Sequence, residues 1–466
     1  MSLLASTTPQ LTQVPISTGV ATALVALLML THIQFAAWQQ GGYIILAVSD
    51  FVGWKRKSAH YDRFSKGLVT ALGATFAIGG SLAIFAVMIL FLGLWGHFFV
   101  DLQKVLFWPF VAEAAAFIGE IACLYPLYAR WDRLGHVRGL RVGLELLLFI
   151  NASLQMLLIN VVASYMLTPR PAFDLPAILL NPTEIPLEIH RFVGNIAWAG
   201  AVIALVAGIR LLLRSGRRPD LRPYLDWMGH YGLIYAIGFT IAQPLVGWEY
   251  AKEIQLHSYA SWYDMMLGGL SVAFLFQVFL LGSIFTVGIF YLWRRVRASG
   301  FRSPALAVCT VLSFAAWLLI ATPSSLAWSY ESVFAANANV PIWQGGLLIP
   351  WGAMIPWKLT ALVAFTGVTI VALTIYLKYA SRGKLRWGDA GRGQAFSLIA
   401  VGISVSLIMA LMGFIRESSR GPFLITNHML INQQQNFSPP STNGPALNGP
   451  ASNAGVSIIL PTELHP

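Results

Sequence analysis

The stretch Ala26-Leu-Leu-Met-Leu-Thr-His32-Ile-Gln-Phe-Ala-Ala-Trp38 (ALLMLTHIQFAAW) lies in an apolar run that begins near residue 18 and carries no charged residue before Asp50. A helix of this length crosses roughly 30 Å of hydrocarbon. Its histidine, His32, is therefore expected inside a membrane, where an ionisable side chain is costly and is a candidate functional residue. His32 could be a packed polar residue, a proton carrier or a ligand.

The composition of the whole chain agrees with a membrane protein. Of its 466 residues, 57% are hydrophobic and 11% are charged, and the mean hydropathy is +0.67, far more apolar than an average soluble domain. The sequence therefore predicts an all-α, polytopic transmembrane helical bundle with about ten spans. The expected spans are residues 18–50, 67–99, 105–129, 142–167, 190–213, 229–248, 265–293, 304–328, 357–378 and 395–415.

The basic residues are distributed unevenly among the connections between these spans. Of the 30 lysine and arginine residues, 23 lie in alternate connections, within residues 55–66, 130–141, 210–222, 294–302 and 378–392. By the positive-inside rule these connections face the cytoplasm, so both termini are expected on the outer side. The net charge of +11 then reflects membrane topology and contact with a lipid bilayer, and we expect no nucleic-acid partner.

Two further features bound the organisation of the chain. Cys123 and Cys309 lie in different apolar segments, so neither a disulfide framework nor a two-cysteine metal motif is predicted. Residues 427–466 are polar and rich in proline, asparagine and serine. Such a composition favours an extended C-terminal tail without a packed core of its own.

The third span contains two acids, Glu113 and Glu120. They lie seven residues apart, which is two helical turns, so both are expected on one face of the helix. Two buried acids in a line suit a proton path through a membrane. Hydrogen bonding of each acid to a neighbouring helix is an equally good explanation. Glu145, close to the end of its span, is predicted to be structural.

Three other positions carry side chains that could bind a metal centre. His190 opens the fifth span and is either a ligand or a packed polar group. Met266 begins the seventh span, and a methionine thioether pairs with histidine on six-coordinate haem iron, although methionine in a membrane helix is usually a packing residue. Glu417 and Arg420 close the last span, either as a ligand with a balancing cation or as a helix end that reaches the interface.

These positions, in this order, resemble subunit I of the cytochrome bd oxidases. One specific match is Trp131-Asp132-Arg133-Leu134-Gly135, eleven residues after Glu120. A second is Leu180-Asn181-Pro182, with His190 eight residues later. The segment Asn151-Ala-Ser153 also resembles a family motif of the fourth helix. The resemblance covers about residues 20–270 and the short motif near residue 417.

The resemblance implies ligands for two or three haems. His190 and Met266 would be the axial pair of a low-spin haem b. His32 would be an axial ligand of one high-spin haem, the type at which oxygen is reduced. Glu417 would ligate the other high-spin haem b, with Arg420 beside it. Haem b is the expected cofactor, and haem d is possible.

The resemblance also implies an activity, partners and a location. Glu113 and Glu120 would deliver protons. The chain would be an oxidoreductase subunit that carries electrons from an outer-side donor, quinol or cytochrome c, to oxygen. A second membrane subunit of the bd type and a bacterial inner membrane follow from the family in the same way.

Several positions depart from the family pattern. The outer connection that forms the quinol site in the family is long, but here it spans only residues 249–264, and Lys252 and Glu253 within it do not align convincingly with the family's quinol-contacting residues. Asp264 replaces an arginine two residues before the methionine. The family motif E-x-G-R-Q-P-W reads Glu417-Ser-Ser-Arg420-Gly-Pro-Phe here.

These departures make the chain a divergent member with a very short quinol loop. Two additional spans separate Met266 from Glu417, and Glu331 is an alternative to Glu417 as a ligand. We therefore divide the chain into a haem-binding core (residues 1–293), additional transmembrane helices with the outer Glu/Arg motif (residues 294–426) and the tail (residues 427–466).

Two other functions are compatible with these residues. A haem b membrane subunit that relays electrons between quinone and a redox partner, without reducing oxygen, would need only His190 and Met266. A transporter without haem would use Glu113 and Glu120 for ion or solute movement.

Overall fold

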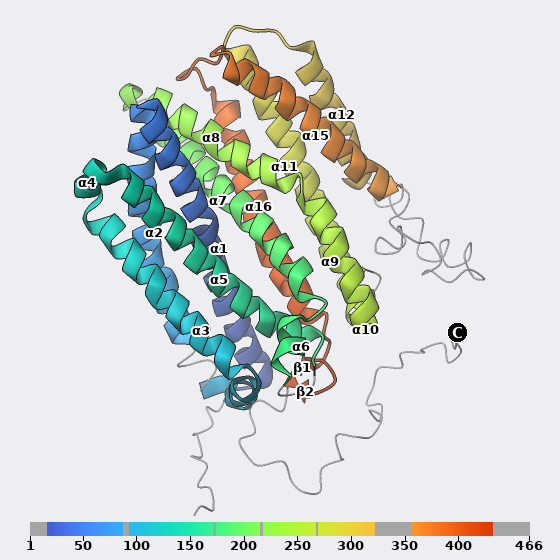
Figure 1. The fold of residues 1–466 in the computed structure, drawn as a ribbon. Coiled ribbons are helices and arrows are strands. Elements are labelled where there is room, and N and C mark those ends of the chain that lie inside the picture. The colour runs from blue at the N-terminus through green and yellow to red at the C-terminus, as the bar shows by residue number, and fades with distance from the viewer. Residues whose placement is uncertain are drawn as a thin grey trace, which may run out of the picture.

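The computed structural model describes residues 16–86, 93–170, 174–214, 218–266, 269–321 and 357–431. Among these residues eight helices are long and apolar enough to cross a membrane, and they form an elongated bundle (Figure 1). The predicted all-α, polytopic bundle is confirmed.

The elements are α1 (Thr18–Arg56), α2 (Ala59–Phe85), α3 (Gly96–Ala129), α4 (Trp131–Leu134), η2 (Gly135–Val137), α5 (Arg138–Leu167), α6 (Leu175–Leu179), α7 (Glu184–Arg214), η3 (Pro219–Leu221), α8 (Arg222–Thr240), α9 (Gln243–His257), α10 (Tyr259–Met266), α11 (Ser271–Ala298), α12 (Pro304–Ala321), α15 (Trp357–Ser381), α16 (Arg392–Ser418), β1 (Phe423–Ile425) and β2 (Met429–Leu430).

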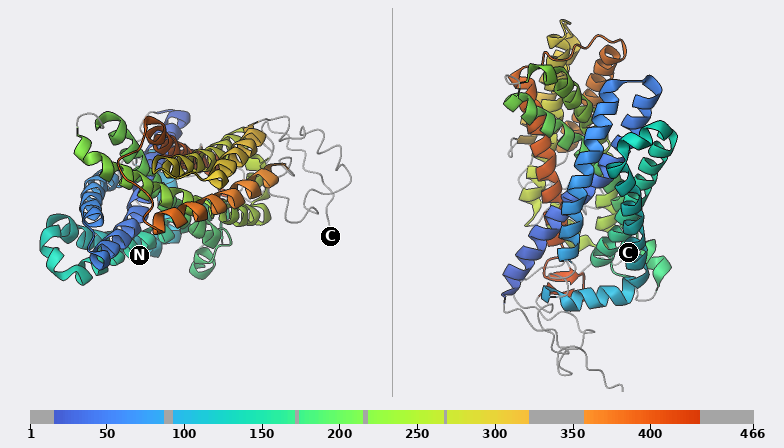
Figure 2. Two further views of the ribbon diagram at one scale, coloured as in Figure 1. Left: turned by 90° about the horizontal axis from the view of Figure 1, so that it is seen from above. Right: turned by 90° about the vertical axis from the view of Figure 1, so that its left-hand side faces the viewer.

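Prolines explain where two predicted spans differ from the observed helices. Helix α3 begins at Gly96 and is broken at Leu106 (φ −116°, ψ 24°), because the ring of Pro109 clashes with the carbonyl one turn earlier. The segment before this break lies across the end of the bundle (Figure 2). The expected sixth span is divided into α8 and α9, and Pro244 lies in the first turn of α9.

The outer connection predicted at residues 249–264 is helical rather than a loop. Helix α9 continues to His257 and α10 covers Tyr259–Met266. Met266 therefore ends a short helix and does not open the following span, which begins at Ser271. Asp264 shapes the turn between them, because its Oδ1 accepts a hydrogen bond from the Gly269 amide at 2.9 Å.

The two ends of the bundle differ in composition. Most of the basic residues lie in connections at the upper end of the bundle in Figure 1. These connections join α1 to α2, α3 to α5, α7 to α8, α11 to α12, and α15 to α16. We call this upper end the basic end. Helices α6 and α10 and the two strands lie at the opposite end, the hairpin end (Figure 1).

Helix α7 occupies the centre of the bundle. It packs against α1 and α5 on one side and against α8 and α16 on the other. Helices α1, α2, α3 and α5 form one group, and α11, α12 and α15 form another. The second group stands at one side of the bundle (Figures 1 and 2), so α12 and α15 are additions to its periphery.

Two glycines allow the backbones of α7 and α8 to touch. A Cβ atom on Gly232 would lie 2.6 Å from the Gly200 carbonyl oxygen and 2.7 Å from the Ala204 amide nitrogen. A Cβ atom on Gly200 would lie 2.7 Å from the Gly232 carbonyl oxygen. Small residues of this kind permit close helix crossings in membranes.

Gly232→Ala is therefore expected to lower the free energy of unfolding by about 1–3 kcal/mol, because the added methyl group must push two backbones apart. Gly238→Ala, on the same helix, is the matched control, since a Cβ atom at Gly238 would have no neighbouring atom within 4 Å. Denaturation of the detergent-solubilised protein would measure both. Equal stability of the two variants would disprove the close crossing.

The hairpin end is closed by β1 and β2, which pair antiparallel. Leu424 and Ile425 belong to an apolar cluster with Phe98 and Leu102 of α3. Residues 427–431, the first part of the expected tail, thus belong to this folded end, whereas residues 432–466 and the alternative ligand Glu331 lie outside the described residues.

Candidate functional site

Tyr250 of α9 is the point at which several candidate residues meet. Its ring lies against the His190 imidazole, with centroids 6.2 Å apart and planes 26° from parallel. Its hydroxyl oxygen accepts a hydrogen bond of 2.8 Å from the Nε of Arg416. Tyr250 therefore joins α7, α9 and α16 at the hairpin end.

His190 has the properties of a ligand histidine. Its Nδ1 is buried and has no hydrogen-bond partner within the described part of the chain. Its backbone carbonyl accepts a hydrogen bond of 3.0 Å from Gln243. The ring also faces the Gly247 backbone, where a Cβ atom would come within 3.4 Å of its Cε1. An unpaired imidazole nitrogen in such a place costs free energy unless another group binds it.

Met266 belongs to the same neighbourhood. It is buried in an apolar cluster that includes Tyr250 of α9, Leu187 of α7 and Ile415 of α16. Leu187 lies one turn before His190 on the same helix. Tyr250 thus packs against His190 of α7 and shares an apolar cluster with Met266 of α10.

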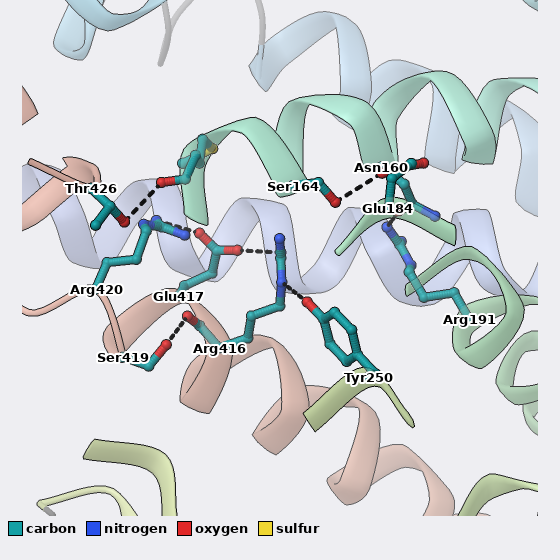
Figure 3. Close-up of polar contacts among 11 residues, drawn as sticks. Asn160, Ser164, Glu184, Arg191, Tyr250, Arg416, Glu417, Ser419, Arg420 and Thr426 are labelled. Carbon is teal, nitrogen blue, oxygen red and sulfur yellow. Dashed lines mark hydrogen bonds and ion pairs between the residues drawn. The ribbon is translucent and has the colours of Figure 1, made fainter. Parts of the chain in front are cut away.

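Glu417 is held between two arginines (Figure 3). Arg416 donates to its Oε1 at 2.8 Å, and Arg420 donates to its Oε2 at 2.6 Å. The side chain of Arg420 is 2% exposed, and that of Glu417 is 45% exposed. Each carboxylate oxygen accepts one hydrogen bond from a guanidinium, and since a carboxylate offers about four lone-pair sites, each oxygen keeps a lone pair for a further partner.

The two arginines retain unused donors. Arg416 Nη2 and Arg420 Nε and Nη1 are buried without a hydrogen-bond partner among the described residues. Buried guanidinium donors of this kind are strong binders of carboxylates and phosphates. Arg416 is also bonded to Tyr250, whose ring lies against His190, so these donors suit a cofactor that carries negative charge, such as a haem with its propionates.

A second set of polar contacts continues from α7 to α5 (Figure 3). Arg191 donates to the side-chain oxygen of Asn160, whose amide nitrogen donates to Glu188 at 2.6 Å. Ser164 donates to Glu184 at 2.8 Å, and the other oxygen of Glu184 is buried and unpaired within the described chain.

Asn181 of the Leu-Asn-Pro motif fixes the start of α7. Its side-chain oxygen accepts from the Thr168 hydroxyl at 2.7 Å and from the Thr183 amide at 3.1 Å. Its amide nitrogen donates to the Thr168 carbonyl at 2.8 Å. These bonds join the end of α5 to the beginning of α7 and thereby position His190 two turns later.

His32 lies apart from Tyr250, on the face of α1 that meets α2. Its Nδ1 is 3.2 Å from the Gly79 carbonyl oxygen. A carbonyl can only accept, so Nδ1 carries the hydrogen and Nε2 keeps a lone pair when the ring is neutral. This is the arrangement of a metal-binding histidine that is oriented by its other nitrogen.

The two acids of α3 have different surroundings. Glu120 is 4% exposed, and its oxygens accept hydrogen bonds from the Tyr43 hydroxyl at 2.7 Å and from Gln155 at 2.5 Å. Glu113 is only half-buried. Their residue type and spacing predict that Glu113 and Glu120 act together in a proton path, but only Glu120 lies in a buried polar cluster.

Several residues of the site were not predicted from the sequence. Tyr250, Asn160 and Glu184 carry no local signal, because their partners are remote in the sequence. Arg191 follows His190 and Arg416 precedes Glu417, and this adjacency to candidate ligands is the sequence feature that could have indicated their place in the site. Among the described residues no three His, Cys, Asp or Glu side chains converge as a metal site; a haem needs only one or two axial ligands from the protein.

Comparisons with known proteins agree with this picture. The family model for cytochrome bd terminal oxidase subunit I matches residues 20–261, just over half of the chain. The solved structure of bd oxidase from Geobacillus thermodenitrificans is similar in fold, with a TM-score of 0.51 and 18% sequence identity over 87% of this chain and 99% of that chain. No curated protein matches the sequence.

Proposed function

The chain belongs to the cytochrome bd terminal oxidase subunit I family, and from this premise we propose that it is the haem-binding subunit of a membrane oxidase that passes electrons from an outer-side donor to oxygen. The observation that carries the proposal is the buried Nδ1 of His190, which has no partner among the described residues, against the ring of Tyr250, a residue that shares an apolar cluster with Met266. Histidine and methionine are an established axial pair for haem iron.

The residues fit two or three haems b, with haem d possible at the oxygen site. His190 and Met266 would hold the low-spin haem. His32 would ligate through Nε2, the nitrogen that its bond to Gly79 leaves available. Glu417 would ligate the remaining haem, with its carboxylate oriented by Arg416 and Arg420. A bound haem would supply the one-electron and oxygen chemistry that protein side chains lack.

The chain's own polar residues would provide charge balance and protons. The free donors of Arg416 and Arg420 would bind propionate carboxylates. Glu120, held by Tyr43 and Gln155, would deliver protons, with Glu113 one step further along α3. Reduction of one oxygen molecule to water consumes four electrons and four protons, so a proton route to the site is as necessary as an electron route.

The positive-inside rule supports an orientation with the basic end in the cytoplasm and the hairpin end outside, in a bacterial inner membrane. The donor, quinol or cytochrome c, would then act at the hairpin end. The charged groups of α9 there pair with each other, Glu249 with Lys252 at 3.5 Å and Glu253 with His257 at 3.4 Å. The family places such a subunit in a complex with a second membrane subunit, which we propose here as well.

One observation favours a second candidate function. Glu417 forms ion pairs with Arg416 and Arg420, so a subunit in which it serves only as their partner would have one ligand fewer for high-spin haem. It would then be a haem b electron-transfer subunit that relays electrons between quinone and a redox partner.

Optical spectroscopy and oxygen consumption of the purified protein distinguish these functions. We expect a Soret band, low-spin and high-spin haem signals, and oxygen uptake with a reduced donor. Low-spin signals without oxygen uptake would support the electron-transfer subunit. A purified protein without a Soret band, even after growth with added haem precursor, would refute both.

A further inference from the structure

Glu145 of α5 is an unusual buried acid. Its side chain is 0% exposed, and neither carboxyl oxygen has a hydrogen-bond partner within the described residues. A buried carboxylate without donors is unfavourable by several kcal/mol, whereas the neutral acid is tolerated far better. Glu145 is therefore stable in this place with its proton bound.

The nearest cation does not compensate a charge on Glu145. Arg141, one turn earlier on α5, donates from Nε to Asp50 Oδ2 at 2.7 Å and from Nη2 to Asp50 Oδ1. Its guanidinium also lies 4.0 Å from the ring of Trp131. The side chains of Arg141 and Asp50 are 3% and 0% exposed. Arg141 and Asp50 neutralise each other, so an ionised Glu145 would leave a net negative charge in a buried place.

The other charged groups nearby are also paired. Arg138 and Asp62, from α5 and α2, form a partly exposed ion pair of 2.9 Å at the basic end. This pair lies one turn beyond Arg141, toward the water at that end. Glu145 thus lies just inside the charged layer, where a proton arriving from the basic end would first meet a buried carboxyl group.

The register of α1 and α5 places Glu145 between the basic end and Tyr43, the residue that is hydrogen-bonded to the proposed proton-delivery acid, Glu120. The two helices run in opposite directions, because Asp50 meets Arg141 near the basic end and Gln40 meets Ser153 at 3.2 Å further along. A position on α5 after Arg141 therefore corresponds to a position on α1 before Asp50.

The distances along the helix axes show that Glu145 and Tyr43 differ little in axial position. Tyr43 lies seven residues before Asp50 on α1, about 10 Å along the axis, and Glu145 lies four residues after Arg141, about 6 Å along it. Along the axis, Glu145 is thus within about one helical turn of Tyr43, and bridging waters would carry the proton across the separation between the two side chains. Tyr43 donates directly to Glu120.

The difference in hydrogen bonding between Glu145 and Glu120 favours proton transfer from the first to the second. Glu120 accepts two hydrogen bonds, from Tyr43 and Gln155, which favour its carboxylate form as a proton acceptor. Glu145 has no such donors and favours the protonated form. We infer that Glu145 is a proton-loading residue that receives protons from the basic end of the bundle and passes them, through the Tyr43 region, to Glu120. This revises the structural role expected from the sequence.

The inference rests on the proposed oxidase function and deepens it. In each transfer the O–H bond of Glu145 breaks and one forms on Glu120, and Glu145 then takes a new proton from water at the basic end. Four such transfers accompany the reduction of one oxygen molecule by four electrons from the outer-side donor. Glu145 touches no haem ligand and acts only through Glu120.

The test compares Glu145→Gln and Glu145→Leu with Asp132→Asn. Asp132 is an exposed acid at the basic end, paired with Lys66 at 2.9 Å, and is the matched control. Infrared difference spectra taken in H₂O and D₂O should show a protonated-carboxyl C=O band in the wild type that both Glu145 variants lose. Oxygen consumption by the same variants should fall at least about tenfold, with the haem spectrum unchanged.

The outcomes separate the two proposals. A carboxyl band that persists in both Glu145 variants overturns the inference, and so does loss of the band with an unchanged rate. The leucine variant guards against misfolding of the glutamine variant, because an apolar side chain needs no hydrogen bond there. If the wild type lacks haem and oxygen uptake, the oxidase function fails, and the relay to Glu120 fails with it, whereas the infrared band still reports on the proton of Glu145.

Discussion

His190→Ala should remove the low-spin haem signal from the optical spectrum and lower oxygen consumption by about a hundredfold or more. Replacing only the partners that orient a metal ligand lowers affinity or activity by 10–100-fold, and here the ligand itself is lost. The vacated space beside Tyr250 also exposes the donors of Arg416 to water. Spectra of the reduced and oxidised protein, with the haem content measured by extraction, provide the readout.

His257→Ala is the control for this experiment. His257 lies at the same end of the bundle, on α9, and is partly exposed beside Glu253 at 3.4 Å. Its replacement should leave the low-spin signal and the rate unchanged. A His190 variant that keeps the full low-spin signal would show that another residue holds this haem, and the axial pair proposed here would then be wrong.

Arg295→Met should lower the free energy of unfolding by about 3–5 kcal/mol, the usual effect of removing one partner of a buried ion pair. Arg295 Nη1 donates to Asp226 Oδ2 at 2.5 Å, and both side chains are 0% exposed. The Gly388 amide donates to the same oxygen at 2.8 Å, so Asp226 joins α8, α11 and the connection before α16. Without Arg295 the Asp226 carboxylate stays buried with much less compensation.

Two further variants make this prediction specific. Arg297→Met removes an exposed arginine two residues away and should change stability by less than about 0.5 kcal/mol. The double variant Asp226→Leu with Arg295→Met should recover much of the lost stability, because apolar replacement of a whole buried pair is often neutral. Thermal denaturation in detergent would compare all three, and a single variant as stable as the wild type would contradict the prediction.

The sequence was a good guide to the bundle because membrane crossing depends on apolarity summed over some twenty residues. Local irregularities shift the ends of such a segment without removing it. Helix α3 illustrates this, since its break at Leu106 follows from Pro109 yet leaves the segment after it apolar and helical. Helix α10 was not anticipated, because an eight-residue helix has too few residues for a periodic signal.

The candidate site was predictable only where chemistry is local. His32, His190 and Glu120 are polar groups in apolar runs and stand out for that reason alone. Tyr250 does not, because its importance comes from meeting Arg416, 166 residues later, at 2.8 Å. The sequence predicts a structural role for Glu145, and the pairing of Arg141 with Asp50, from which a proton-loading role is proposed, has no signal in the sequence.

The polar contacts of Figure 3 also set an order of events during biosynthesis. Arg416 of α16 donates to Tyr250 of α9, and Thr426 donates through its amide and its hydroxyl to the Met166 carbonyl of α5, so the last helix and the hairpin complete contacts with helices made earlier. The ribosome must therefore finish α16 before these contacts can form. If His190 holds a cofactor as proposed, the complete site would form only after synthesis of α16, and a nascent chain stopped after α11 would lack Arg416 as a partner of Tyr250.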